Sequence, residues 1–230
     1  MLPLAPVLWR QGRHLRRVTP ILPEAGGPWS GAIAGPDPLR LLVLGDSTAS
    51  GVGVDTQQDG LPGQLARALH ARGGRGIEWT AIGRSGATSR DIIEQYLPTA
   101  PADLLFLSIG ANDALGLRTT AAFAKDVRAI LTHVRSLNPA TTILMSSLPV
   151  FHRFELLPQP LKRTLYRHSI ALETAARHVV DGFDDAHMSA DPPPYSEGFF
   201  ATDLFHPSAI GYRDWVDFAV DDAVRAGLLR

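Results

Sequence analysis

The chain has 230 residues, of which 45% are hydrophobic and 20% charged, so it can bury the sizeable core of a single globular domain. Its 22 Lys and Arg against 23 Asp and Glu give a net charge of −1, which argues against a nucleic-acid partner, because such proteins carry a marked basic excess. The absence of cysteine excludes disulfides, thiolate metal sites and cysteine nucleophiles.

Residues 1–38 are rich in proline, at positions 3, 6, 20, 23, 28, 36 and 38. Because proline removes a backbone donor and interrupts helices, we predict an extended arm here and a separate folded domain over residues 39–230. The apolar run from Met1 to Trp9 is too short to span a membrane, and its arginines follow it, whereas a secretory signal begins with them. These features favour a cytoplasmic protein. Contact of the arm with a membrane surface is the less favoured alternative.

From Leu39 onward, strand and helix patterns alternate along the chain. Strands are expected where short apolar runs end in glycine or polar residues, and helices where apolar residues recur every three or four positions. In chain order the patterns predict strand 41–44, helix 61–73, strand 77–82, a short helix capped by Ser89, strand 104–107, helix 123–137, strand 142–145, helix 161–178 and a last helix beginning at Ser208. This alternation predicts an α/β fold with a mostly parallel central sheet of about five strands between two helical layers.

Polar and glycine-rich blocks follow three of these strands, and a fourth block lies near the C-terminus. They are Gly45-Asp46-Ser47, Gly83 to Thr88, Gly110-Ala111-Asn112-Asp113 and Asp203-Leu204-Phe205-His206. Each block alone is compatible with a turn or a helix cap. Because ligands bind at the carboxyl ends of parallel strands, the four blocks together predict a functional site.

In their order and spacing, the four blocks resemble the motifs of the GDSL, or SGNH, hydrolase family across residues 40–215. The resemblance implies a three-layer α/β/α sandwich of the flavodoxin-like type and a serine esterase that acts on a small-molecule ester without metal or cofactor. Thr48 stands where the family name has leucine. This position is not a reacting group, so the departure affects only packing beneath the nucleophile.

Three residues suit nucleophilic catalysis. Ser47, at a strand end, can present a hydroxyl, but a serine needs a base to become a nucleophile. His206 can take that proton, and Asp203 can hold the imidazole in the required tautomer. A second Asp-x-x-His sequence ends at His187. We favour His206 because Pro207 and Ser208 directly after it begin the final helix.

The resemblance also implies an oxyanion hole. Its donors would be the backbone N–H groups of Ser47 and Gly86 and the side-chain amide of Asn112, all aimed at the negative charge that forms on attack. Glycine at position 86 leaves room for the substrate because it has no Cβ. We expect Asp46 and Asp113 to hold loops by hydrogen bonds.

The predicted function is hydrolysis of short- to medium-chain carboxylic esters through an acyl-enzyme, since no helical lid pattern is present to cover a long acyl chain. Aromatic residues are expected to line the substrate cleft, with one histidine: Phe151, His152, Phe154, Phe199 and Phe200. An acyltransferase or a carbohydrate O-acetylesterase would use the same triad. A flavodoxin-like module that binds phosphate or flavin through residues 47–51 is the alternative from a different class.

Overall fold

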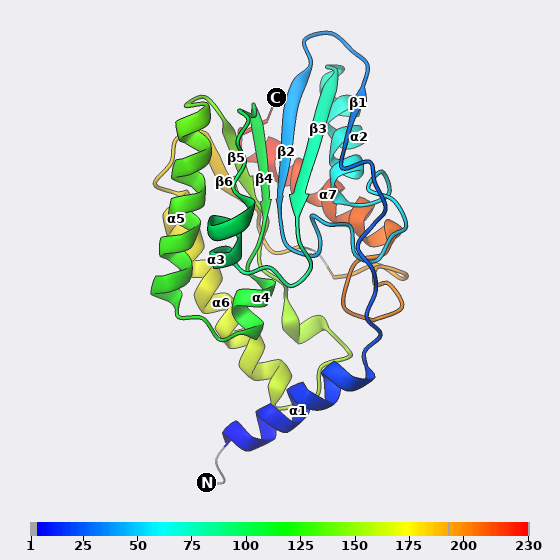
Figure 1. The fold of residues 1–230 in the computed structure, drawn as a ribbon, viewed down its shortest axis with the longest axis vertical. Helices are drawn as coiled ribbons and strands as arrows, with labels where there is room; N and C mark the ends of the chain where they lie inside the picture. The colour runs from blue at the N-terminus through cyan, green and yellow to red at the C-terminus, as the bar shows by residue number, and fades with distance from the viewer. Residues whose placement is uncertain (1–3, 193, 230) are drawn as a thin grey trace.

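A six-stranded sheet forms the centre of the molecule (Figure 1). The computed structural model describes residues 4–192 and 194–229. The strands are β1 (Ser30–Ile33), β2 (Leu39–Gly45), β3 (Ile77–Gly83), β4 (Leu104–Ser108), β5 (Thr142–Met145) and β6 (Ala186–Met188). Their order is β1-β3-β2-β4-β5-β6, with β1 antiparallel to β3 and the other neighbours parallel. The direction of winding therefore changes between β2 and β4, where ligands bind in folds of this class.

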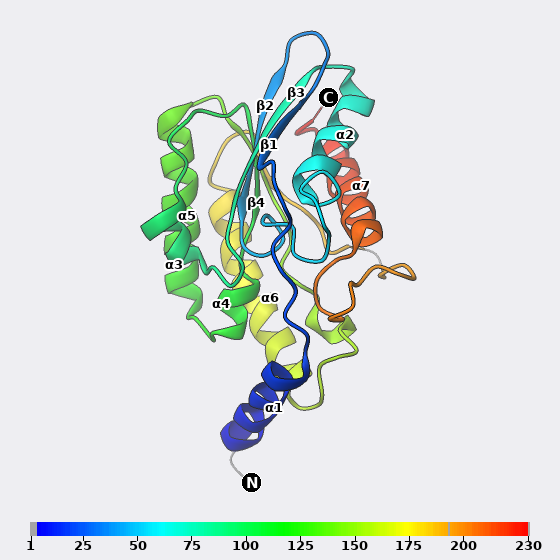
Figure 2. The same cartoon turned by 45° about the vertical axis from the view of Figure 1, so that its right-hand side comes forward.

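Helices cover both faces of the sheet, so the predicted three-layer sandwich is confirmed (Figure 2). α2 (Leu61–Gly73) and α7 (Ala209–Arg225) lie on one face, and α5 (Thr120–Leu137) and α6 (Leu161–Val180) on the other. The shorter elements are α3 (Ser89–Asp91), the π-helical turn Ile92–Tyr96, α4 (Ala111–Leu115) and the 3₁₀ turn Phe151–Arg153.

Alternate residues of the central strands enter two different apolar cores. In β2, Leu41 and Val43 pack with the α2 and α7 side, whereas Leu42 and Leu44 pack with the α5 and α6 side. Successive strand side chains point to opposite faces, so a strand covered on both faces needs an unbroken apolar run. Each fully buried leucine stabilises the fold by about 1.5–3 kcal/mol relative to an exposed one.

Two helix ends show how local sequence sets the element boundaries. Gly74 ends α2 in the left-handed conformation, with φ of 65°, as the glycine pair predicted. The short helix near residue 89 is capped by Thr88 and not by Ser89, which corrects the prediction. The Thr88 hydroxyl accepts the N–H of Asp91, and the Asp91 carboxylate accepts the N–H of Thr88 in return. Ser89 instead bonds to Asp113.

The prediction of an extended arm over residues 1–38 was wrong for the first part of this stretch, which is helical. α1 (Leu4–Val18) is a helix of 15 residues, because the run between Pro6 and Pro20 contains no proline and Pro6 falls in its first turn, where proline is tolerated. β1 extends the sheet as its antiparallel edge strand. Division of the chain into an arm and a domain at residue 38 stays a prediction. None of the helices in the described residues combines the length and apolar character needed to cross a membrane.

Candidate active site

The first polar block turns sharply at the end of β2 and buries Ser47. Gly45 pairs with Ser108 of β4, and a Cβ on Gly45 would lie 2.0 Å from the Ser108 carbonyl oxygen, so only glycine permits this approach of the two strands. The Ser47 carbonyl accepts the N–H of Val52 at 2.9 Å and the Ser50 hydroxyl at 3.1 Å. These contacts hold Ser47, which is 6% exposed, at the carboxyl edge of the sheet.

The C-terminal block brings an imidazole to this serine. Ser47 Oγ lies 2.9 Å from His206 Nε2, and His206 Nδ1 lies 2.6 Å from Asp203 Oδ2. The other carboxylate oxygen of Asp203 accepts the backbone N–H groups of Phe205 and His206 at 3.0 and 2.9 Å. The spacing of three residues therefore lets one aspartate hold both the turn and the ring of His206.

The hydrogen bonds around Asp203 decide which ring nitrogen carries a proton. Burial opposes ionisation of Asp203, but the bonds from the side chain and backbone of His206 and from the backbone of Phe205 outweigh it and lower its pKa. An ionised carboxylate can only accept, so the proton of a neutral His206 lies on Nδ1. Nε2 is then the acceptor that faces Ser47.

A second carboxyl group, that of Asp46, belongs to the residue directly before Ser47 and lines the same pocket. The backbone N–H and hydroxyl of Thr48 donate to Asp46 Oδ1 at 3.1 and 3.2 Å, and Thr48 Oγ1 lies 2.7 Å from Ser108 Oγ. Burial raises the pKa of Asp46 from 3.8 to about 6, and the bonds from Thr48 oppose this only in part. The polar side chain at position 48 thus belongs to a hydrogen-bonded chain that joins the loop after β2 to β4.

Gly86 lies in the loop after β3, and Asn112 lies in the first turn of α4, which follows β4. Gly86 is exposed and has φ of +82°, a conformation that disfavours any residue with a Cβ, yet a Cβ there would meet no protein atom within 4 Å. The positive φ of the backbone, and not a lack of space, therefore favours glycine at position 86. Asn112 Nδ2 donates to the Ala87 carbonyl at 3.0 Å, which ties α4 to the loop after β3 and orients the amide.

The acidic residue of the third block, Asp113, is fully buried and joins three elements. It accepts the N–H and hydroxyl of Ser89 at 2.9 and 2.7 Å, and Arg118 Nε lies 3.0 Å from its Oδ1. Arg118 also pairs with Asp126 on α5. This network anchors α4, which carries Asn112, and accounts for Asp113 as a structural residue.

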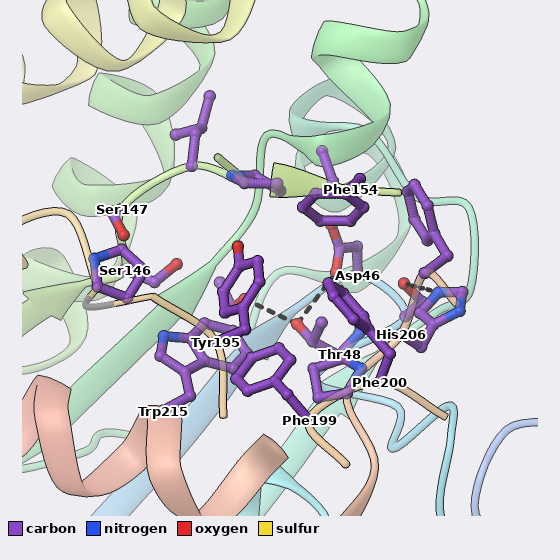
Figure 3. Close-up of a pocket in the computed structure, with 18 of the residues that line it drawn as sticks. Asp46, Thr48, Ser146, Ser147, Phe154, Tyr195, Phe199, Phe200, His206 and Trp215 are labelled. Carbon is purple, nitrogen blue, oxygen red and sulfur yellow. Dashed lines mark hydrogen bonds between the residues drawn. The ribbon is translucent and has the colours of Figure 1, made fainter. Parts of the chain in front are cut away.

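An apolar pocket opens beside Ser47 and His206 (Figure 3). In that view His206 lies on one side of the aromatic group, and Ser146, Ser147 and Trp215 lie on the other. The aromatic rings contact one another, with centroids of Tyr195 and Phe199 stacked 4.3 Å apart. The aromatic lining residues are Phe154, Tyr195, Phe199, Phe200, Phe205 and Trp215.

Three of the five expected cleft residues line this pocket, namely Phe154, Phe199 and Phe200. Phe151 and His152 do not, which corrects the prediction. Phe151 is completely buried in the core on the α5 and α6 side, because the 3₁₀ turn directs it inward. His152 is exposed, and its ring lies 4.3 Å from that of Tyr166 on α6, in an edge contact.

The competing histidine, His187, lies on β6 at the sheet edge and has a different partner. Its Nε2 lies 2.8 Å from Asp222 Oδ2 on α7, so the second Asp-x-x-His sequence does not form a pair within itself. Asp222 also accepts the N–H of Ala190. His187 is therefore held in a contact between β6 and α7.

Several pocket residues were not identified from the sequence. Ser146 and Ser147 directly follow β5, so the rule that sites lie at the carboxyl ends of parallel strands could have found them. Trp215 reaches the pocket from α7, whose apolar pattern is that of an ordinary packed helix. Only the packing of α7 across the sheet indicates that this side chain belongs to the site.

Comparisons with known proteins identify the family and the fold of the chain. A model of the GDSL-like Lipase/Acylhydrolase family matches residues 43–213. The GDSL-like esterase Rv1075c of Mycobacterium tuberculosis is 27% identical over 244 residues, which cover 93% of this chain and 76% of that protein. The lipase Lip_vut3 from a goat rumen metagenome superposes with a TM-score of 0.65 at 15% identity, covering 84% of this chain and 99% of that one. A family 3 carbohydrate esterase of Clostridium thermocellum superposes with a TM-score of 0.59 at 17% identity, covering 83% of this chain and 97% of that one. At such low identities, the two structural matches show a shared fold.

Proposed function

The chain belongs to the GDSL-like lipase/acylhydrolase family and is a carboxylic ester hydrolase, and from this premise we propose that it cleaves short- to medium-chain esters through an acyl-enzyme on Ser47. The observation that carries the proposal is the hydrogen-bonded series from Ser47 through His206 to Asp203. Its order matches the roles of nucleophile, base and orienting carboxylate.

In the first half of the reaction, His206 Nε2 takes the hydroxyl proton of Ser47 as the oxygen attacks the ester carbonyl carbon. The carbonyl π electrons move to oxygen and form a tetrahedral oxyanion. The imidazolium that results is stabilised by the ionised Asp203 carboxylate at Nδ1. Collapse of the intermediate breaks the bond to the alcohol, which leaves with the proton from Nε2.

The oxyanion needs donors that are already in place. We assign these to the backbone N–H groups of Ser47 and Gly86 and to the side-chain amide of Asn112. The bond from Asn112 to the Ala87 carbonyl supports this role, because it uses one of two amide N–H groups and orients the other. One such donor typically contributes about 10²–10³ to kcat.

In the second half, water replaces the alcohol. His206 takes a proton from water, whose oxygen attacks the acyl carbon, and then returns the proton to Ser47 Oγ as the carboxylic acid is released. If another alcohol attacked in place of water, the same residues would perform acyl transfer. A carbohydrate O-acetylesterase would differ only in the alcohol part of its substrate.

The pocket composition supports a small apolar acyl or aryl group as the occupant. Its described lining includes six aromatic side chains but no lysine or arginine. Anionic phosphate groups are normally held by cations or by backbone N–H groups of a glycine-rich loop. Here the Thr48 hydroxyl donates to the Asp46 carboxyl group, an acidic neighbour. This lining favours an ester substrate over the flavin- or phosphate-binding alternative.

The test is covalent labelling of the purified protein with a fluorophosphonate, with the labelled peptide identified by mass spectrometry. We expect one adduct on Ser47, while Ser47→Ala keeps the wild-type circular dichroism and unfolding midpoint but loses both labelling and hydrolysis of p-nitrophenyl acetate. Ser50→Ala is a matched control, because Ser50 is also buried in this loop but its hydroxyl donates to the Ser47 carbonyl and not to a histidine. An adduct on another serine would contradict the assignment.

A further inference from the structure

One side of α1 packs against the body of the protein at the end where the site lies (Figures 1 and 2). Gln11 Nε2 donates to the Gln159 carbonyl at 2.6 Å, and Gln11 Oε1 accepts the Leu161 N–H at 3.2 Å. Leu15 packs against the core beneath α5 and α6. These contacts fix the helix beside the segment 151–160, which supplies Phe154 to the pocket.

The other side of α1 is a basic surface. Arg10, Arg13 and Arg17 are spaced three and four residues apart, which places them on one helix face, and all three are exposed. Arg16 is also exposed, and no ion pair between described residues involves any of these four. The helix contains no Asp or Glu.

The positive charge of α1 contrasts with a net negative charge on the rest of the protein. The chain has 22 Lys and Arg against 23 Asp and Glu, and four of its arginines lie on α1, so the rest of the protein is net negative. A charge separation of this kind orients a protein in front of an anionic surface.

Exposed apolar side chains accompany the arginines. Of the ten large hydrophobic residues that are exposed among those described, four lie between positions 7 and 21: Val7, Trp9, Val18 and Ile21. By helical spacing, Val7 and Val18 share the face of Gln11 and Leu15, whereas Trp9 lies on the face of the arginines. Ile21 is 94% exposed and Trp9 61%. The Arg13 guanidinium lies 5.1 Å above the Trp9 ring, so aromatic and cationic groups form one surface.

We propose that α1 and the residues up to Ile21, the α1 surface, dock on an anionic phospholipid bilayer. The arginines would bind lipid phosphates, while Trp9 and Ile21 would enter the interfacial layer, where tryptophan is favoured. Nucleic acid offers no apolar layer to receive Trp9 and Ile21. Docking by this face brings the segment 151–160, and with it the pocket, close to the bilayer. The proposal does not depend on the assignment of the catalytic residues.

The first experiment measures sedimentation of the full chain with vesicles of phosphatidylcholine alone or mixed with phosphatidylglycerol. Each arginine near an anionic surface strengthens partitioning by about fivefold, so Arg10→Gln with Arg13→Gln should weaken binding to the mixed vesicles by about 25-fold. The control is Lys125→Gln with Arg128→Gln, which removes the same charge at the same spacing from exposed positions on α5 and should leave binding unchanged.

A second readout separates insertion from electrostatic attraction. Trp9 is exposed, whereas the tryptophans at 29, 79 and 215 are buried or half-buried, so mixed vesicles should shift the fluorescence to the blue in the wild type but not in Trp9→Phe. Ser47→Ala should bind as the wild type does, and the arginine variant should keep its rate on soluble p-nitrophenyl acetate. Equal partitioning of wild type and arginine variant, or a blue shift that persists in Trp9→Phe, would overturn the proposal.

Discussion

The buried carboxyl of Asp46 should make the stability of this protein depend on pH in a defined direction. The residue is 2% exposed, and its burial raises its pKa from 3.8 to about 6 against the opposing effect of the Thr48 hydrogen bonds and of His206. Asp46→Asn removes this ionisation while it keeps an oxygen that can accept both bonds from Thr48. The difference between the two proteins therefore isolates the proton equilibrium of one group.

The sign follows from which state holds the proton. Between pH 3.8 and about 6 the folded protein retains a proton on Asp46 that the unfolded chain has lost, so the free energy of unfolding falls as the pH rises. A difference of about two pKa units corresponds to about 3 kcal/mol. Relative to Asp46→Asn, the free energy of unfolding of the wild type should fall by about 3 kcal/mol as the pH rises from below 3.8 to above about 6. At higher pH the difference between the two proteins should stay nearly constant.

Urea unfolding followed by fluorescence, at several pH values on both sides of this window, measures the difference. The midpoint of the wild type should fall relative to that of Asp46→Asn by on the order of 1 M urea as the pH rises. Asp184→Asn is the control, because Asp184 is exposed and should give a difference from wild type that does not change with pH. Parallel profiles for Asp46→Asn and wild type would show that the folded-state carboxyl ionises normally and would refute the reasoning.

Three further predictions concern catalysis. His206→Ala should lower kcat for p-nitrophenyl acetate by at least about 10³-fold. His187→Ala removes the contact with Asp222 and should keep kcat within about twofold of wild type. The reverse result would mean that His187 is the base. Asn112→Ala should lower kcat by about 10²–10³ with little change in KM, since the amide acts on charge that forms in the transition state; a change confined to KM would mean that Asn112 only positions the substrate. In a series of p-nitrophenyl esters, acetate and butyrate should give higher kcat/KM than laurate or palmitate. The reason is that a methylene of the acyl chain contributes about 0.8 kcal/mol only where a groove buries it. A maximum of kcat/KM at the long-chain esters would reveal such a groove.

The fold and its local elements were largely predictable from the sequence. The unbroken apolar runs of β2 and β4 are required of strands covered on both faces, and the glycine pair at 73–74 ended α2 as expected. β6 was missed because three residues at a sheet edge show no periodicity, and α1 because its prolines were given more weight than the proline-free run between them. β6 depends on its pairing with β5 and not on local propensity, whereas α1 has a local cause in its proline-free run.

The site divides in the same way. Ser47, Asp203 and His206 were proposed from motif blocks, and the turn that Asp203 forms with its own neighbours is a local property of those residues. Three features were decided only by the tertiary structure: the pairing of His187 with Asp222, the entry of Trp215 into the pocket, and the burial that raises the pKa of Asp46. Each depends on groups far apart in the chain that meet when helices pack on the sheet, and the desolvation of a carboxyl is set by everything packed around it. A sequence pattern records which residues neighbour one another along the chain, and these properties depend on neighbours in space.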